Sequence, residues 1–86
     1  MPQISEFHGI VIRMFHSEHG PPHFHASDGE DEALIGFDPI RVMHGRLLAR
    51  CRRLVFEWAN AHERELRENW NRGERKDAFD QIDPLP

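Results

Sequence analysis

The first half of the chain alternates between apolar and polar residues with the two-residue period of β-strands. The alternation is clearest in four short stretches, residues 9–16, 22–27, 32–37 and 40–44. Glycine, proline and acidic residues separate these stretches, and such residues favour turns. Short strands joined by short polar turns predict a four-stranded antiparallel meander.

The second half of the chain changes to the period of an amphipathic helix. Apolar positions recur at steps of three and four residues in a stripe formed by Leu48, Cys51, Val55, Trp58, His62 and Leu66. This pattern predicts one long helix that ends near Gly73, because glycine commonly follows helices. The helix would be about 38 Å long at ~1.5 Å per residue, whereas four strands span about 20 Å at ~4.8 Å per strand. We therefore expect the helix to overhang the sheet.

The predicted fold class is α+β, with a four-stranded antiparallel sheet and one long C-terminal helix packed on one face. Residues 1–73 would form a single ββββα domain, and residues 74–86 would form a tail. The overhanging end of the helix carries Leu66 and Trp70. Two alternatives remain open for these apolar side chains: the tail folds back over them, or they bind a protein partner or a second copy of the chain.

Composition narrows the class of protein. The chain has 86 residues, a net charge of −4, 38% hydrophobic residues and 30% charged residues, which is typical of one globular domain. No apolar run approaches the ~20 residues that span a bilayer, and the N-terminus lacks a signal-peptide pattern. The one cysteine, Cys51, cannot form an internal disulfide. We expect a cytoplasmic protein without membrane contact.

Candidate chemistry concentrates in the stretch SEHGPPHFHASDG, residues 17–29. If Phe24 points into the core, His23 and His25 point outward together, since they lie two residues apart on one strand. His19 precedes the Pro-Pro bend and could fold back toward them. Three imidazoles with an open fourth position resemble a catalytic zinc site, and imidazole also suits other transition metals.

The same histidines support other interpretations. His23 and His25 could act as base and acid in a small ribonuclease-type hydrolase, because imidazole titrates near neutral pH. They could also be surface residues without chemistry. Glu18 is a further candidate oxygen ligand for a metal.

Arginine is the only charged residue type between Pro39 and Phe56. The five positions are Arg41, Arg46, Arg50, Arg52 and Arg53. Spacing places Arg46, Arg50 and Arg53 along one side of the start of the helix, where the helix dipole disfavours cations. These three are candidate binding residues for RNA phosphates or for an acidic protein.

The residues as a set resemble a family of short bacterial proteins known only as a domain of unknown function. The likeness rests on EHGPPHFHA, on RLVFEWANAHERELRENW and on the closing IDPL, and it covers nearly the whole chain. The resemblance implies a small fold of four strands and one helix, and gene pairs similar to toxin–antitoxin pairs. It implies no established activity. The pattern residues carried over by position are His19, Pro21, Pro22, His23, Phe24, His25, Trp58, His62 and Trp70.

The sequence favours a small interaction module, one component of a toxin–antitoxin-like pair, that binds a protein partner or a second copy through the long helix and Trp70. The histidine-dependent hydrolase and the metal-binding protein are the alternatives. No cofactor is firmly implied, and whether the protein is an enzyme stays open.

Overall fold

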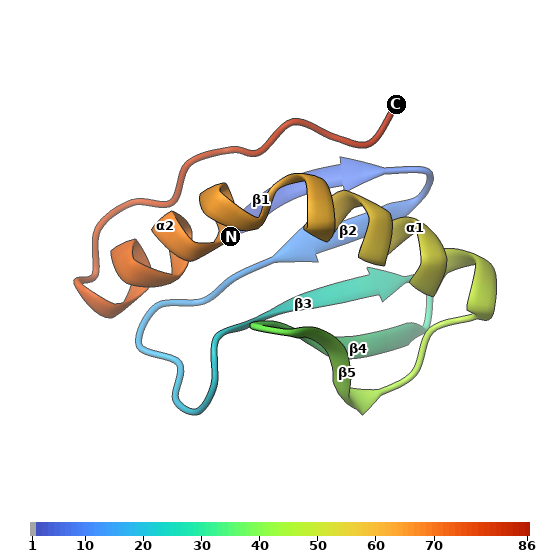
Figure 1. Ribbon diagram of the computed structural model, residues 1–86, viewed down its shortest axis with the longest axis horizontal. Coiled ribbons are helices and arrows are strands. Elements are labelled where there is room, and N and C mark those ends of the chain that lie inside the picture. The colour runs from blue at the N-terminus through green and yellow to red at the C-terminus, as the bar shows by residue number, and fades with distance from the viewer. Residues whose placement is uncertain (1) are drawn as a thin grey trace.

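Five strands precede two helices in the structure, a computed structural model that describes residues 2–86 (Figure 1). The elements are β1 (Gln3–Phe7), β2 (Ile10–Arg13), β3 (His23–Asp28), β4 (Asp31–Phe37), β5 (Ile40–Gly45), α1 (Ala49–Ala61) and α2 (Glu63–Glu74). The strands form one antiparallel sheet in the order β1-β2-β3-β4-β5. Both helices lie on one face of this sheet. The α+β class and the antiparallel meander are therefore confirmed.

The sheet has five strands, so the prediction of four was wrong. The additional strand, β1, joins β2 through His8 and Gly9, whose φ angles of 51° and 80° suit a tight hairpin turn. The two-residue pattern is obscured in β1 because its register shifts between Gln3 and Ser5. As a result the consecutive residues Ile4 and Ser5 are both buried.

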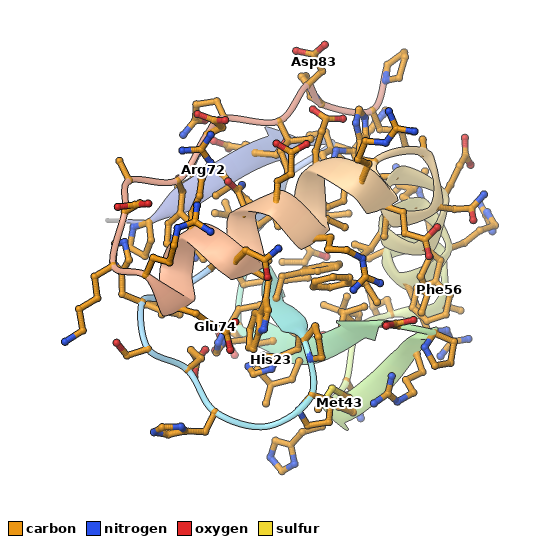
Figure 2. All side chains as sticks on the ribbon, turned by 60° about the vertical axis from the view of Figure 1, so that its left-hand side comes forward. His23, Met43, Phe56, Arg72, Glu74 and Asp83 are labelled. Atoms are coloured by element: carbon orange, nitrogen blue, oxygen red, sulfur yellow. The ribbon has the colours of Figure 1, made fainter. Side chains whose placement is uncertain are left out.

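Two helices replace the single long helix that the sequence predicted. The break lies at His62, which has φ −121° and ψ 29° and whose N–H donates to the carbonyl oxygens of both Trp58 and Ala59. An unbroken helix over residues 49–74 would be about 39 Å long, whereas the largest extent of the molecule is 33 Å. The axes of α1 and α2 point in different directions (Figure 2). Each helix therefore packs against the core, and the predicted overhang does not form. Within residues 2–86, neither helix is long and apolar enough to cross a membrane.

The hydrophobic core lies between the helices and one face of the sheet. Trp58 of α1 is fully buried, and its ring centroid lies 5.4 Å from that of Phe7 and 5.6 Å from that of Phe24. Phe24 is also fully buried. The prediction that Phe24 points into the core beneath the helical segment is confirmed.

The C-terminal tail folds back past α2 toward β1 (Figure 1). It buries Ile82, whose N–H donates to the carbonyl oxygen of Ile4 at 2.8 Å. Leu66 of α2 is fully buried, and Trp70 is half-buried. Of the two alternatives left open by the sequence, the tail folding back is the one observed.

A histidine–glutamate cluster as candidate metal centre

The candidate site lies at the start of β3. Strand alternation places His23 and His25 on the face opposite Phe24. Residues 14–22, the loop between β2 and β3, fold over this end of the strand, and the N–H of Ser17 in this loop donates to the carbonyl oxygen of Gly73 in α2. Figure 2 shows His23 between α2 and this loop.

Glu18, in the middle of the loop, contacts both imidazoles with one carboxylate oxygen. Its Oε1 lies 2.6 Å from Nε2 of His25 and 3.3 Å from Nε2 of His23. The three residues offer one ligand atom each, and these atoms all lie within 4.8 Å of one another. We name Glu18, His23 and His25 the histidine–glutamate cluster.

The other nitrogen of each imidazole is also occupied. Nδ1 of His23 lies 2.9 Å from the carbonyl oxygen of Pro21, and Nδ1 of His25 lies 3.3 Å from Oε2 of Glu32. A carbonyl and a carboxylate accept hydrogen bonds only, so Nδ1 must carry a proton in both contacts. Each ring therefore faces acceptors on both sides. Either a second proton on Nε2 or a cation between Nε2 and Glu18 satisfies this arrangement.

The cluster is largely shielded from water. His23 is 6% exposed, His25 is 19% exposed and Glu18 is 29% exposed. The indole of Trp70 covers His23 with ring centroids 5.2 Å apart, and the ring of Phe15 meets His25 edge-on at 4.7 Å. Glu18 is the most exposed member of the cluster, and a surface pocket lined by His25, Glu32 and His44 adjoins the other side of His25.

The pKa of Glu18 lies below its ordinary value. Burial raises the pKa of this carboxyl, but the hydrogen bonds and positive charges of His25 and His23 outweigh burial. The carboxylate is therefore ionised near neutral pH, which is the state that a metal ligand requires.

Two imidazoles and one carboxylate are a ligand set found in catalytic zinc sites, where the fourth position stays open. At metal–ligand distances of ~2.0–2.1 Å, neighbouring ligand atoms in a tetrahedron lie about 3.3–3.4 Å apart. The contact between His23 and Glu18 already has this length, and the contact between His25 and Glu18 would open by less than ~1 Å. The acceptors at both Nδ1 atoms match the outer hydrogen bonds that orient metal-binding histidines.

The structure brings together only part of the residue set named from the sequence. His19 is exposed and lies outside the cluster, and Glu18 occupies the position that His19 was expected to fill. The turn around Gly20, with φ 90°, sends the chain into the Pro-Pro bend directly after His19. Strand alternation fixes where a strand residue points, but it says nothing about residues in such a loop.

The histidines and the helix arginines are not brought together. Cys51 of α1 donates from Sγ to Oδ2 of Asp28 at 2.9 Å, so the start of α1 lies at the far end of β3. That end is about 16 Å from His23 at ~3.3 Å per residue. Arg50 and Arg53 flank Cys51 in the sequence and are exposed. The structure therefore does not bring these arginines together with His23 and His25 in one hydrolytic site.

Of the remaining predicted binding residues, Trp70 adjoins the histidines and Arg46 does not. Arg46 is exposed beside the start of α1, and within residues 2–86 it forms no ion pair, nor do Arg50 and Arg53. Trp70 packs against His23 and Phe37.

Sequence reasoning missed Glu32 as a partner of His25. The signal was present in the turn at Asp28 and Gly29, because that hairpin pairs Ser27 with Glu32. Strand alternation then places Glu32 on the same face as His25.

Comparison with known proteins identifies a family for this chain but no activity. No curated protein and no solved structure matched the chain. The family described as Domain of unknown function (DUF4160) matches residues 9–71, a range that includes the whole histidine–glutamate cluster. Because this match spans more than half of the 86 residues, the chain belongs to the DUF4160 family of unknown function.

Proposed function

We propose that this protein binds a divalent transition metal, zinc or a metal of similar ligand preference, through Glu18, His23 and His25. One observation carries the proposal: both Nε2 atoms face the same carboxylate oxygen, while both Nδ1 atoms face other acceptors. A dication between Nε2 and Glu18 would replace the additional protons that this geometry otherwise requires.

Charge supports the same proposal. With neutral imidazoles, the carboxylates of Glu18 and Glu32 give the site two negative charges, and a dication would neutralise them. Both nitrogens that would bind the metal are shielded, and low exposure strengthens such electrostatic attraction. Protons compete with the metal for Nε2, so affinity should fall as the imidazoles become protonated.

The test is a calorimetric titration of the untagged protein with Zn²⁺. We expect one equivalent to bind, and we expect Glu18→Gln and His25→Ala to weaken binding by about ten-fold or more. His19→Ala is the matched control, because His19 is exposed beside Glu18 in the sequence yet lies outside the cluster. Equal affinities for Glu18→Gln and His19→Ala, or no binding by the unaltered protein, would refute the proposal.

A second readout uses Trp70, whose ring lies 5.2 Å from that of His23. Cu²⁺ bound at the cluster should quench the fluorescence of Trp70 because the indole lies against a ligand. Trp70→Phe should remove most of this quenching, since Trp58 is the remaining tryptophan and contacts Phe24 on the opposite face of β3. Quenching that persists in Trp70→Phe would place the copper elsewhere.

An interaction module in a toxin–antitoxin-like pair is the second candidate. The supporting observation is that the exposed Arg46, Arg50 and Arg53 have no ion-pair partner within residues 2–86, which suits an acidic protein surface. Co-expression with the product of an adjacent short gene tests it. A complex that dissociates at high salt and is lost in the double variant Arg50→Glu/Arg53→Glu would support it, and two separately eluting proteins would refute it.

A further inference from the structure

Strands on both sides of the histidine pair carry an arginine on the face of the sheet that His25 occupies. Arg13 of β2 pairs with His25 of β3 and shares its face, because the alternate residues Ile10 and Ile12 are buried in the core. On the other side, His23 pairs with Gly36 of β4. Cross-strand neighbours lie ~4.5–5.5 Å apart, so both positions adjoin the histidine–glutamate cluster.

Gly36 leaves room for the Arg41 side chain next to the position that pairs with His23. Arg41 pairs with Gly36 across β4 and β5, and a Cβ at Gly36 would lie only 2.8 Å from Nη1 of Arg41 and 2.9 Å from Sδ of Met43. Nη1 of Arg41 therefore lies close to Gly36, the residue that pairs with His23. Any larger residue at this position would displace the guanidinium.

Neither guanidinium is neutralised. Within residues 2–86, Arg13 and Arg41 form no ion pair; Arg13 donates from Nη1 to Oγ of Ser27, and Arg41 donates from Nη1 to the carbonyl oxygen of Pro39. Nε of Arg13 has no hydrogen-bond partner. That Nε is buried, whereas Nη2 of both arginines has no hydrogen-bond partner within residues 2–86 and is left to bind an anion.

We infer that this face binds the phosphate group of an anionic ligand beside the metal, an inference that rests on the proposed metal site. The charges of Arg13 and Arg41 offset those of Glu18 and Glu32, so the region formed by these four groups has no net charge without a metal. A dication makes it positive, and an oxyanion could occupy the open coordination position while the two arginines bind its other oxygens. Phosphate binding should therefore depend on the metal.

Two probes test the inference by calorimetry, with and without one equivalent of Zn²⁺: phenyl phosphate, a monoester, and a short oligouridylate, a chain of phosphodiesters. We expect the zinc-loaded protein to bind at least one probe and the metal-free protein to bind at least ten-fold more weakly. The probe that binds better identifies the source of the phosphate. If Zn²⁺ binds in a manner that depends on Glu18 but neither probe binds, this inference fails and the metal site stands. If Zn²⁺ does not bind, both fail.

Arginine variants separate a specific site from general charge attraction. Arg41→Gln should weaken binding of the phosphate probe about ten-fold or more, and Gly36→Ala should weaken it in the same direction by displacing the guanidinium. Arg64→Gln is the matched control, because Arg64 is exposed on α2 and has no ion-pair partner within residues 2–86. Equal losses in Arg41→Gln and Arg64→Gln would overturn the inference, and so would unchanged binding in Arg41→Gln.

Discussion

The side-chain amide of Asn69 in α2 binds the backbone of Asp80 in the tail through two hydrogen bonds. Nδ2 donates to the carbonyl oxygen of Asp80, and the N–H of Asp80 donates to Oδ1, each at 2.9 Å. Asn69 is only 1% exposed, although asparagine is usually found at the surface. This pair of bonds attaches the tail to the helix, next to the point where Ile82 enters the core.

Asn69→Ala should detach the tail locally. The substitution removes both hydrogen bonds to the backbone of Asp80, which should lower the free energy of unfolding by about 1–3 kcal/mol. Urea denaturation measures this loss, and limited proteolysis should cut residues 77–86 faster. Asn71→Ala is the control, because Asn71 is exposed on the same helix. Comparable losses in the two variants would show that the Asn69 bonds do not hold the tail.

Trp58 should be among the largest single contributors to stability. Trp58→Ala should lower the free energy of unfolding by about 3–5 kcal/mol, because it leaves a cavity against Phe7 and Phe24. Trp58→Phe should lower it less, since a ring remains but the 2.8 Å hydrogen bond from Nε1 to the carbonyl oxygen of Asp83 is lost. Thermal unfolding of both variants checks the order. Equal losses would contradict the cavity argument.

Gly45 and Gly9 have similar φ angles but different surroundings. Both have left-handed φ values, 76° and 80°, so alanine at either position should cost about 1–2 kcal/mol in backbone strain. A Cβ at Gly45 would also clash with the backbone carbonyl oxygen of Glu32, whereas a Cβ at Gly9 meets nothing within 4 Å. Chemical denaturation should therefore show a larger loss for Gly45→Ala. A larger loss for Gly9→Ala would be inconsistent with this geometry.

Cys51 should be unreactive in the folded protein. The hydrogen bond to the carboxylate of Asp28 and burial both raise the pKa of the Cys51 thiol above its ordinary value. The thiol therefore stays protonated at pH 8, and iodoacetamide should modify it far more slowly in the folded protein than in urea. Because the folded-state pKa is raised, the stability from this contact is complete below the ordinary thiol pKa and is lost as pH rises through the raised value. Equal alkylation rates in folded and unfolded protein would count against this assignment.

Metal removal should lower thermal stability if Zn²⁺ binds as proposed. A ligand present at 100 times its dissociation constant adds about 2.7 kcal/mol to the free energy of unfolding, so EDTA should lower the melting temperature of the zinc-loaded protein. Glu18→Gln is the control and should respond much less to both zinc and EDTA. An identical response of the two proteins would exclude the cluster as the source of the stabilisation.

Local periodicity accounts for much of what the sequence predicted. The strands β3, β4 and β5 and the burial of Phe24 follow from alternation over neighbouring residues, a property that distant contacts do not alter. The helical region was also evident from its three- and four-residue steps. The pairing of His23 and His25 on one face is a consequence of the same period, and so is the position of Glu32 once the hairpin register is known.

The sequence by itself determined the α+β class, the antiparallel meander and the two imidazoles of the candidate site, because each depends on residues close together in the chain. Tertiary structure alone decided three features. The register shift in β1 follows from pairing with β2, the break at His62 lets both helices pack within the length of the molecule, and the loop before β3 brings Glu18 rather than His19 to the histidines. Each depends on contacts between segments that the chain only brings together on folding, and no local pattern encodes such contacts.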